Sequence, residues 1–178
     1  MKDYIKTYTG IWMVPTEPAP NDFRVEDIAH ALSLICRGNG QIKTFFSVGQ
    51  HCINCAKEAA ARGYSNRIVL ACLLHDASEC YLSDIPRPFK KHLTGYSELE
   101  HMMLDMINTK FLGTPPTEEE KKIIRSIDDD MLYYDLSVLL EIPQDTPEPQ
   151  LKTDLSFEFR PFEEVEKEYL EMFARYSE

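Results

Sequence analysis

Apolar residues recur at helical spacing along most of this chain, and polar or proline-rich stretches separate the runs. Residues 1–24 carry three prolines and predict an irregular segment, with short β structure expected around residues 5–12. The proline- and acid-rich residues 143–161 predict a long surface loop. The pattern predicts an all-α protein with helices near residues 25–36, 46–62, 66–80, 97–112, 118–141 and 161–176.

Local signals support two of the helix starts. Thr117-x-x-Glu120 and Ser97-x-x-Glu100 both match the capping box, in which the two side chains bond each other's backbone N–H groups. Gly113 is expected to end the helix that Ser97 opens.

Length and charge limit the classes of protein. The 178 residues fit one compact domain spanning residues 1–178. The net charge of −11 argues against a nucleic-acid polymer as partner, because binding the phosphate backbone needs a basic face. Residues 1–6 lack the apolar core of a signal peptide, and no apolar run approaches membrane-spanning length. We therefore expect a cytoplasmic protein without a membrane partner; a homo-oligomer stays open.

The five cysteines are odd in number and mostly lie in apolar helical stretches. They predict small core residues in a reducing compartment. Cys52 and Cys55 form a Cys-x-x-Cys in mid-helix without a preceding strand, so a redox role is not favoured. With His51 adjacent the pair could capture zinc, an interpretation that ranks below packing.

A His-Asp pair closes an apolar run at Leu73-Leu74-His75-Asp76. Adjacent helical residues point about 100° apart, so both can bind one ion only where the helix edge faces a cavity. Glu79 lies four residues after His75 and three after Asp76, so its side chain returns to the same edge of the helix. That edge offers two metal ligands and a possible base, although most His-Asp pairs are solvated or cap a helix.

A second imidazole lies beside a predicted core stripe. His51 falls in a stretch whose apolar members recur at helical spacing: Val48, Cys52, Cys55 and Ala59.

A carboxylate also falls on an apolar face. In the helix that Thr117 opens, Asp128 and Asp135 share a face with Ile127 and Met131, whereas Asp129 and Asp130 point away. A carboxylate on such a face costs several kcal/mol unless it is paired or binds a metal. The alternative is an ordinary bond to a backbone or basic group.

Taken in order, His51, His75, Asp76 and Asp128 resemble the HD-domain phosphohydrolase superfamily. That family pattern is a His, a His-Asp pair and a distant Asp, on helices gathered around one metal. The closest resemblance, over residues 75–90, is to the bacterial 5′-deoxynucleotidases; the first half also looks like small phage and bacterial HD phosphohydrolases.

The resemblance implies a single HD-domain bundle of about six helices around one metal site. His51, His75, Asp76 and Asp128 would bind one divalent transition metal ion, since mixed imidazole and carboxylate ligands suit Mn, Co, Fe, Ni or Zn better than Mg.

The resemblance also implies roles for four other residues. Glu79 and Asp84 occupy the positions of catalytic carboxylates, one to orient or deprotonate the attacking water and one to protonate the leaving oxygen. Arg37 matches an arginine that contacts the nucleotide phosphate in the deoxynucleotidases, although its spacing to His51 along the chain differs by one residue from theirs. Lys90 matches a lysine of the family segment and could bind phosphate as a point charge; a plain surface lysine is equally expected.

One departure concerns the sugar. Gly38 stands where these relatives have an aromatic residue that helps to exclude a ribose 2′-hydroxyl. Deoxy selectivity is therefore in doubt. Trp12, the only tryptophan, could replace that aromatic, but a packing role in the N-terminal segment is favoured.

The sequence thus predicts a metal-dependent phosphohydrolase acting on a small-molecule nucleotide, most simply a 5′-nucleotidase of ribo- or deoxynucleoside monophosphates. One alternative is release of triphosphate or pyrophosphate from a nucleoside triphosphate or an alarmone. The other is a non-catalytic HD module that binds a nucleotide.

Overall fold

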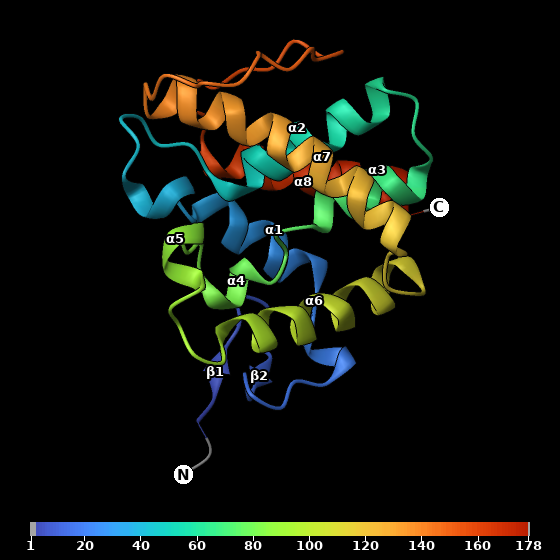
Figure 1. Cartoon of the computed structure of the whole chain (residues 1–178). Helices are drawn as coiled ribbons and strands as arrows, with labels where there is room; N and C mark the ends of the chain where they lie inside the picture. Colours follow the sequence, from blue (N-terminus) through green and yellow to red (C-terminus); the bar gives the residue numbers. More distant parts are fainter. Residues whose placement is uncertain (1–2, 178) are drawn as a thin grey trace.

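The computed structural model describes residues 3–177, which form a helical bundle with one small two-stranded sheet (Figure 1). The prediction of a mostly α protein is confirmed. The longer helices are α1 (Val25–Leu34), α2 (Val48–Ala61), α3 (Asn66–Leu74), α6 (Tyr96–Leu112), α7 (Glu118–Tyr134) and α8 (Phe162–Tyr176). Two four-residue helices, α4 (Glu79–Leu82) and α5 (Arg87–Lys90), join α3 to α6. Residues 1–2 and 178 of the predicted domain lie outside the described residues.

The core lies where α8 packs on α1, α2 and α3. Its centre includes the fully buried side chains of Leu32, Leu73 and Tyr169. The Tyr169 hydroxyl donates to the Leu73 carbonyl at 2.7 Å, so this buried polar group is satisfied. Gly49 allows the close approach of α1 to α2, because an added Cβ would lie 3.2 Å from the Leu32 backbone.

Helix α2 begins with a capping box that the sequence analysis did not name. Ser47 Oγ accepts the Gln50 N–H at 3.1 Å, and Gln50 Oε1 accepts the Ser47 N–H at 3.2 Å. This start places His51 in the first turn. The preceding segment pairs with the chain after α1, through the Arg37 N–H to the Phe46 carbonyl at 2.8 Å. Arg37 is therefore held beside the start of α2.

The predicted helix 66–80 is interrupted, which corrects the sequence analysis. Helix α3 ends at Leu74, and a tight turn over residues 75–78 leads into α4. The Cys72 carbonyl, which a continuing helix would pair with the Asp76 N–H, bonds His75 Nδ1 at 2.7 Å. A local side-chain bond therefore replaces the helical one at the position where the predicted site begins.

Helix α7 follows its prediction at the start and departs from it at the end. The Thr117–Glu120 capping box is confirmed. The α-helix ends at Tyr134, and residues Asp135–Leu139 form a π-helical turn, η3. Such turns rotate the side chains that follow them and are common at functional sites.

The predicted capping box of α6 is wrong. The helix begins at Tyr96 after Gly95, whose φ of 80° makes a left-handed turn, and Ser97 lies inside the first turn without capping it. The predicted stop at Gly113 is confirmed, with a φ of 81° at that residue.

The N-terminal segment contains the expected short β structure. Strand β1 (Ile5–Lys6) pairs antiparallel with β2 (Trp12–Met13), and a short 3₁₀ turn, η1 (Pro20–Asp22), precedes α1. Trp12 is 65% exposed, and its ring contacts Tyr4 edge-on at 6.1 Å. It therefore lies mostly in solvent, with this one aromatic contact inside the N-terminal segment, and it is absent from the cavities described below.

The predicted loop 143–161 contains neither helix nor strand, and it is fastened to the bundle. Phe157 stacks near Phe46 of the segment before α2, at 5.6 Å, and near Tyr134, at 6.2 Å. Glu58 of α2, fully buried, accepts the N–H groups of Lys152 and Thr153 at 2.9–3.1 Å. The loop therefore covers α2 beside the end of α7.

The structure of residues 3–177 also tests the predictions on the cysteines and on membrane-spanning helices. All five cysteines are free, and Cys52, Cys55 and Cys72 are buried in the core as expected. Among the helices of residues 3–177, none combines the length and the apolar character that a membrane crossing requires.

Candidate metal centre

The four predicted metal ligands bring their donor atoms together. His51 Nε2 lies 3.1 Å from Asp128 Oδ1 and 3.3 Å from His75 Nε2. His75 Nε2 lies 3.5 Å from Asp128 Oδ1 and 3.3 Å from Asp76 Oδ2, which is 3.8 Å from His51 Nε2. The donors come from α2, from the turn after α3 and from α7.

These separations fit one transition-metal ion. Imidazole and carboxylate donors bind such ions at about 2.0–2.2 Å, so two donors on one ion lie about 3.0 Å apart at a right angle and about 3.4 Å apart at a tetrahedral angle. The separations among the His51, His75 and Asp128 donors, 3.1–3.5 Å, are close to this range, and Asp76 Oδ2 approaches the two imidazoles at 3.3 Å and 3.8 Å. The residues present could therefore hold the ion that the sequence predicts.

Both imidazoles are oriented with Nε2 toward the centre. His75 Nδ1 donates to the Cys72 carbonyl at 2.7 Å, so when the ring is neutral its lone pair lies on Nε2, the nitrogen that faces the other donors. His51 Nδ1 lies 3.0 Å from Asp135 Oδ2, although at an angle outside hydrogen-bond geometry. A carbonyl or carboxylate behind each ring is the usual support of a metal-binding histidine.

Thiols lie next to the same donors. Cys55 Sγ is 3.6 Å from His51 Nε2, and it could share an ion with His51, His75 and Asp128. Cys52 forms a similar group with His75 and Asp76. Burial raises the pKa of Cys52, which keeps this thiol protonated and is consistent with a packing role.

The electrostatics of the cluster favour positive charge at its centre. Burial alone would lower the pKa of His75, but the charges of Asp76 and the bond to Asp128 outweigh it, so the pKa lies well above its ordinary value. Burial alone would raise the pKa of Asp128, but the bonds from His51 and His75 hold it well below its usual range. The cluster thus stabilises a bound proton, or equally a cation.

Arg37 is drawn into this cluster. Its Nε donates to Asp135 Oδ2 and its Nη1 to Asp76 Oδ2, each at 3.1 Å. Burial alone would lower the pKa of Arg37, but Asp135, Asp76 and Asp84 raise it well above its usual value. Its Nη2 lies 3.1 Å from His51 Nε2, so the side chain is a fixed, buried cation in contact with the predicted metal ligands, where the sequence predicted a phosphate-binding arginine.

The two predicted catalytic carboxylates are both buried near Asp76. Burial, together with the charges of Asp76 and Asp84, raises the pKa of Glu79 well above its ordinary value. Asp84 follows Ser83, whose φ of 72° reverses the chain, and accepts the Gly38 N–H at 2.7 Å. The structure thus places Glu79 and Asp84 on one side of the candidate centre.

Lys90 is engaged by two carboxylates. Its Nζ donates to Glu79 at 3.1 Å and to Glu100 at 2.6 Å. Burial alone would lower the pKa of Lys90, but these carboxylates raise it. The structure places this lysine at the site rather than on the open surface.

The other aspartates of α7 follow the helical-face prediction. Asp130 pairs with Arg62 at 2.7 Å, away from the cluster. Asp129 is 46% exposed and pairs at 3.0 Å with Arg87 Nη2, the same nitrogen that donates to Asp128, and it does not join the donor group itself.

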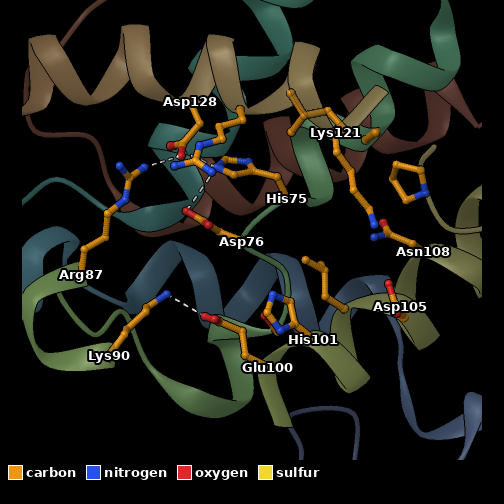
Figure 2. Close-up of a pocket in the computed structure, with 16 residues that line it drawn as sticks. His75, Asp76, Arg87, Lys90, Glu100, His101, Asp105, Asn108, Lys121 and Asp128 are labelled. Atoms are coloured by element: carbon orange, nitrogen blue, oxygen red, sulfur yellow. Dashed lines mark hydrogen bonds and ion pairs between the residues drawn. The ribbon is translucent and has the colours of Figure 1, made fainter. Parts of the chain in front are cut away.

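Two cavities meet at the cluster and share Asp76, Arg87, Lys90 and Asp128. One of about 540 Å³, here the apolar cavity, is lined by Arg37, Gly38, Glu79 and Asp84 and by leucines of α7 and the following turn. The other, of about 640 Å³, here the polar cavity, runs past His75 between α6 and α7. In Figure 2 it extends from Arg87 and Lys90 past His75 to Lys121 and Asn108.

Sequence reasoning did not assign Asp135 and Arg87, which the structure brings to the centre, and it ranked a zinc-binding role of Cys55 with His51 below packing. Asp135 lies two helical turns after Asp128 on the same face, and this spacing was the available signal. Cys55 lies one turn after His51, a spacing equally visible in the sequence. Arg87, which donates to Asp128 at 3.1 Å, stands between two prolines and carries no periodic signal.

The fold and the site define a predominantly α-helical protein with a buried His, Cys and Asp cluster that could hold a metal ion. The chain is 32% identical over 164 residues to the uncharacterized protein RCAP_rcc00048 of Rhodobacter capsulatus, covering 84% of this chain and 83% of that protein. It belongs to the same family as that protein. It is also 34% identical over 113 residues to the uncharacterized protein YfdR of Escherichia coli K12. That match covers 64% of this chain and 60% of YfdR, less than two thirds of its length. No family model matches the chain.

Proposed function

We propose that this protein is a metal-dependent phosphohydrolase of the HD-domain type that acts on nucleotides, most simply on 5′-monophosphates. The observation that carries the proposal is the convergence of His51, His75, Asp76 and Asp128. The donor atoms of His51, His75 and Asp128 lie 3.1–3.5 Å from one another, and Asp76 Oδ2 lies 3.3 Å and 3.8 Å from the two imidazole nitrogens. The ordered carbonyl and carboxylate behind the two rings add support.

A divalent transition metal ion held there would polarise a phosphoryl oxygen and lower the pKa of a bound water. The surrounding side chains supply the remaining functions. Arg37, held by Asp135, and Lys90 place two positive charges beside the cluster, where they neutralise the phosphate charge that persists through phosphoryl transfer.

Glu79 and Asp84 divide the proton transfers. The raised pKa of Glu79 makes it the better proton donor to the leaving oxygen, and Lys90 holds its carboxyl group in place. Asp84, fixed by the Gly38 N–H, is the better candidate for orienting the attacking water.

The apolar cavity fits the nucleoside. Ile42 and a group of leucines give it faces that can cover a base, while Asp76, Glu79 and Asp84 stand at the end where the phosphate would react. The leucines are Leu132, Leu136, Leu139 and Leu140.

A phosphate-release assay tests the proposal. The protein, stripped of metal and reloaded with Mn, Co or Zn, is offered ribo- and deoxynucleoside mono-, di- and triphosphates. We expect metal-dependent release of phosphate from at least one monophosphate. If nucleotides bind but no substrate turns over with any metal, the protein is a binding module and the proposal is wrong.

A further inference from the structure

The thiol of Cys55, on α2, lies beside the donor atoms of the candidate metal centre and has no part in the function proposed above. Its Sγ is 3.6 Å from His51 Nε2. With one donor atom each from His51, His75 and Asp128 it forms a group whose atoms all lie within 4.8 Å of one another. The centre therefore offers sulfur as well as nitrogen and oxygen.

The position of Cys55 along α2 aims its side chain at His51. Residues four apart share one face of a helix, and helical side chains lean back toward the N-terminus. The same spacing lets two side chains of one helix bind a single ion in other metal sites. Both residues are buried, His51 completely and Cys55 with 1% exposed. The imidazole and the thiol thus approach the centre together from the core side.

The separation of sulfur and nitrogen fits a shared ion. Zinc binds sulfur at about 2.3 Å and imidazole nitrogen at about 2.0–2.1 Å, so two such donors lie about 3.5–3.6 Å apart at a tetrahedral angle. Cys55 Sγ and His51 Nε2 are 3.6 Å apart. His51 Nε2 is also 3.3 Å from His75 Nε2 and 3.1 Å from Asp128 Oδ1, between the right-angle and tetrahedral values given above. One ion could therefore contact all four donors.

The donors divide between the core side and the open side of the centre. The side chains of Asp76 and Asp128 are 18% and 19% exposed, and both line the apolar cavity. Neither His51 nor Cys55 lines that cavity. A bond from Cys55 would therefore leave the side on which a substrate phosphate approaches free.

We propose that Cys55 is a ligand of the metal ion, alongside His51, His75 and Asp128, and that its sulfur selects an ion of the zinc class over manganese. On binding, the Cys55 S–H bond breaks, the sulfur bonds the ion and the proton passes to the buffer. Thiolate ligands favour zinc, whereas carboxylate oxygens also suit manganese. The inference rests on the proposed function only for the presence of a metal ion here, and it adds a ligand that the family pattern of His, His-Asp and Asp does not contain.

Cys52 is the other thiol near the cluster, and the geometry favours Cys55. The donor group that contains Cys52 holds His75 and Asp76 but neither His51 nor Asp128. Cys52 is fully buried on the same helix. Cys52→Ala therefore removes the same atom from the same helix and is the matched control for Cys55→Ala.

Cobalt substitution tests the ligand without turnover. The protein is stripped of metal and loaded with Co²⁺, and bound cobalt is measured by elemental analysis together with the absorption spectrum. A thiolate bound to Co²⁺ gives a near-ultraviolet charge-transfer band that nitrogen and oxygen ligands do not give. We expect this band in the wild type and in Cys52→Ala. It should be absent from Cys55→Ala and from Cys55→Ser, which keeps the size of the side chain.

Competition with a chromophoric chelator measures metal selectivity in the same proteins. Losing a group that only supports a metal ligand costs about 10–100-fold in affinity, so we expect the loss of the ligand Cys55 to weaken zinc binding by about a hundredfold. Manganese binding should weaken less, because manganese gains less from sulfur. Cys52→Ala should keep the wild-type ratio of the two affinities.

The wild-type spectrum alone can overturn the proposal. Cobalt bound without the charge-transfer band, or no bound cobalt at all, would show that Cys55 is a packing residue; so would a band that persists in Cys55→Ser or is lost in Cys52→Ala. The result is also separate from catalysis. A protein that shows the band and hydrolyses no nucleotide keeps this ligand and loses the proposed function, whereas turnover without the band keeps the function and loses the ligand.

Discussion

Asp135 joins two groups that the sequence predicted separately, the metal ligand His51 and the cation Arg37. One of its oxygens lies 3.0 Å from His51 Nδ1 and 3.1 Å from Arg37 Nε. Asp135→Asn keeps the shape and removes the charge. We expect metal affinity to fall about ten- to a hundredfold, the usual effect of losing a carboxylate behind a metal-binding histidine.

Competition with a chromophoric chelator measures that affinity directly. Asp129→Asn, a change of the same kind at a more exposed position on α7, is the control and should bind metal normally. Asp135→Glu should recover part of the affinity if the charge matters. Equal affinities in Asp135→Asn and Asp129→Asn would show that Asp135 serves packing alone.

Substitutions at Glu79 and at His75, four residues apart, should separate metal binding from chemistry. Glu79→Gln should keep metal content near that of the wild type and lower kcat by about a hundredfold or more, because a positioned acid is lost. His75→Ala should lose the metal and the activity together. Metal content and turnover are measured on the same samples; a Glu79→Gln protein that turns over normally would remove Glu79 from the mechanism.

Gly38 carries the prediction on sugar selectivity. Its φ of 62° favours glycine for backbone reasons, and it lines the apolar cavity without a side chain. We expect matched ribo- and deoxynucleoside monophosphates to differ by less than about tenfold in kcat/KM, or under about 1.4 kcal/mol. A hundredfold preference for the deoxy substrate would mean that another side chain, such as Ile42, forms the missing wall.

At the scale of elements, the sequence predicted what depends on local pattern. The six long helices follow apolar spacing, and Thr117 and Gly113 mark ends where a single side chain or a glycine decides the geometry. The break after Leu74 depends on the imidazole of His75 taking a backbone carbonyl, which no periodicity shows. Helix α5 is one turn long and has no period to detect.

The contact between α2 and loop 143–161 supplies an element-scale prediction. Glu58 is fully buried and accepts two loop N–H groups and the Arg62 Nε–H at 2.8 Å. Glu58→Ala leaves these donors unpaired, and we expect the free energy of unfolding to fall by about 3 kcal/mol. Urea denaturation measures it, with the exposed Glu163→Ala as control. Loss below about 1 kcal/mol would mean that water replaces the carboxylate.

At the scale of the whole molecule, the sequence predicted residues that the structure brings together, but not what surrounds them. A helical pattern singles out His51 and Asp128, whereas the His-Asp pair and the family resemblance marked His75 and Asp76. The cavities on either side, and the place of Arg87 between them, depend on how α5, α6 and α7 sit against α3. That arrangement results from packing between segments distant in sequence, which residue spacing does not encode.

The same arrangement would link metal binding to global stability. The predicted ligands lie on α2, on the turn after α3 and on α7, so an ion bound there only by the folded chain would stabilise the contacts among all three. At a free metal concentration a hundred times Kd, the gain is about 2.7 kcal/mol. For a protein of this size that corresponds to a rise in Tm of about 5–10 °C.

Thermal unfolding with Mn, Co or Zn, and again after chelation, measures the rise, which should be absent in His75→Ala. An equal rise in His75→Ala would place the stabilising ion elsewhere, and the four predicted ligands would then not be its site.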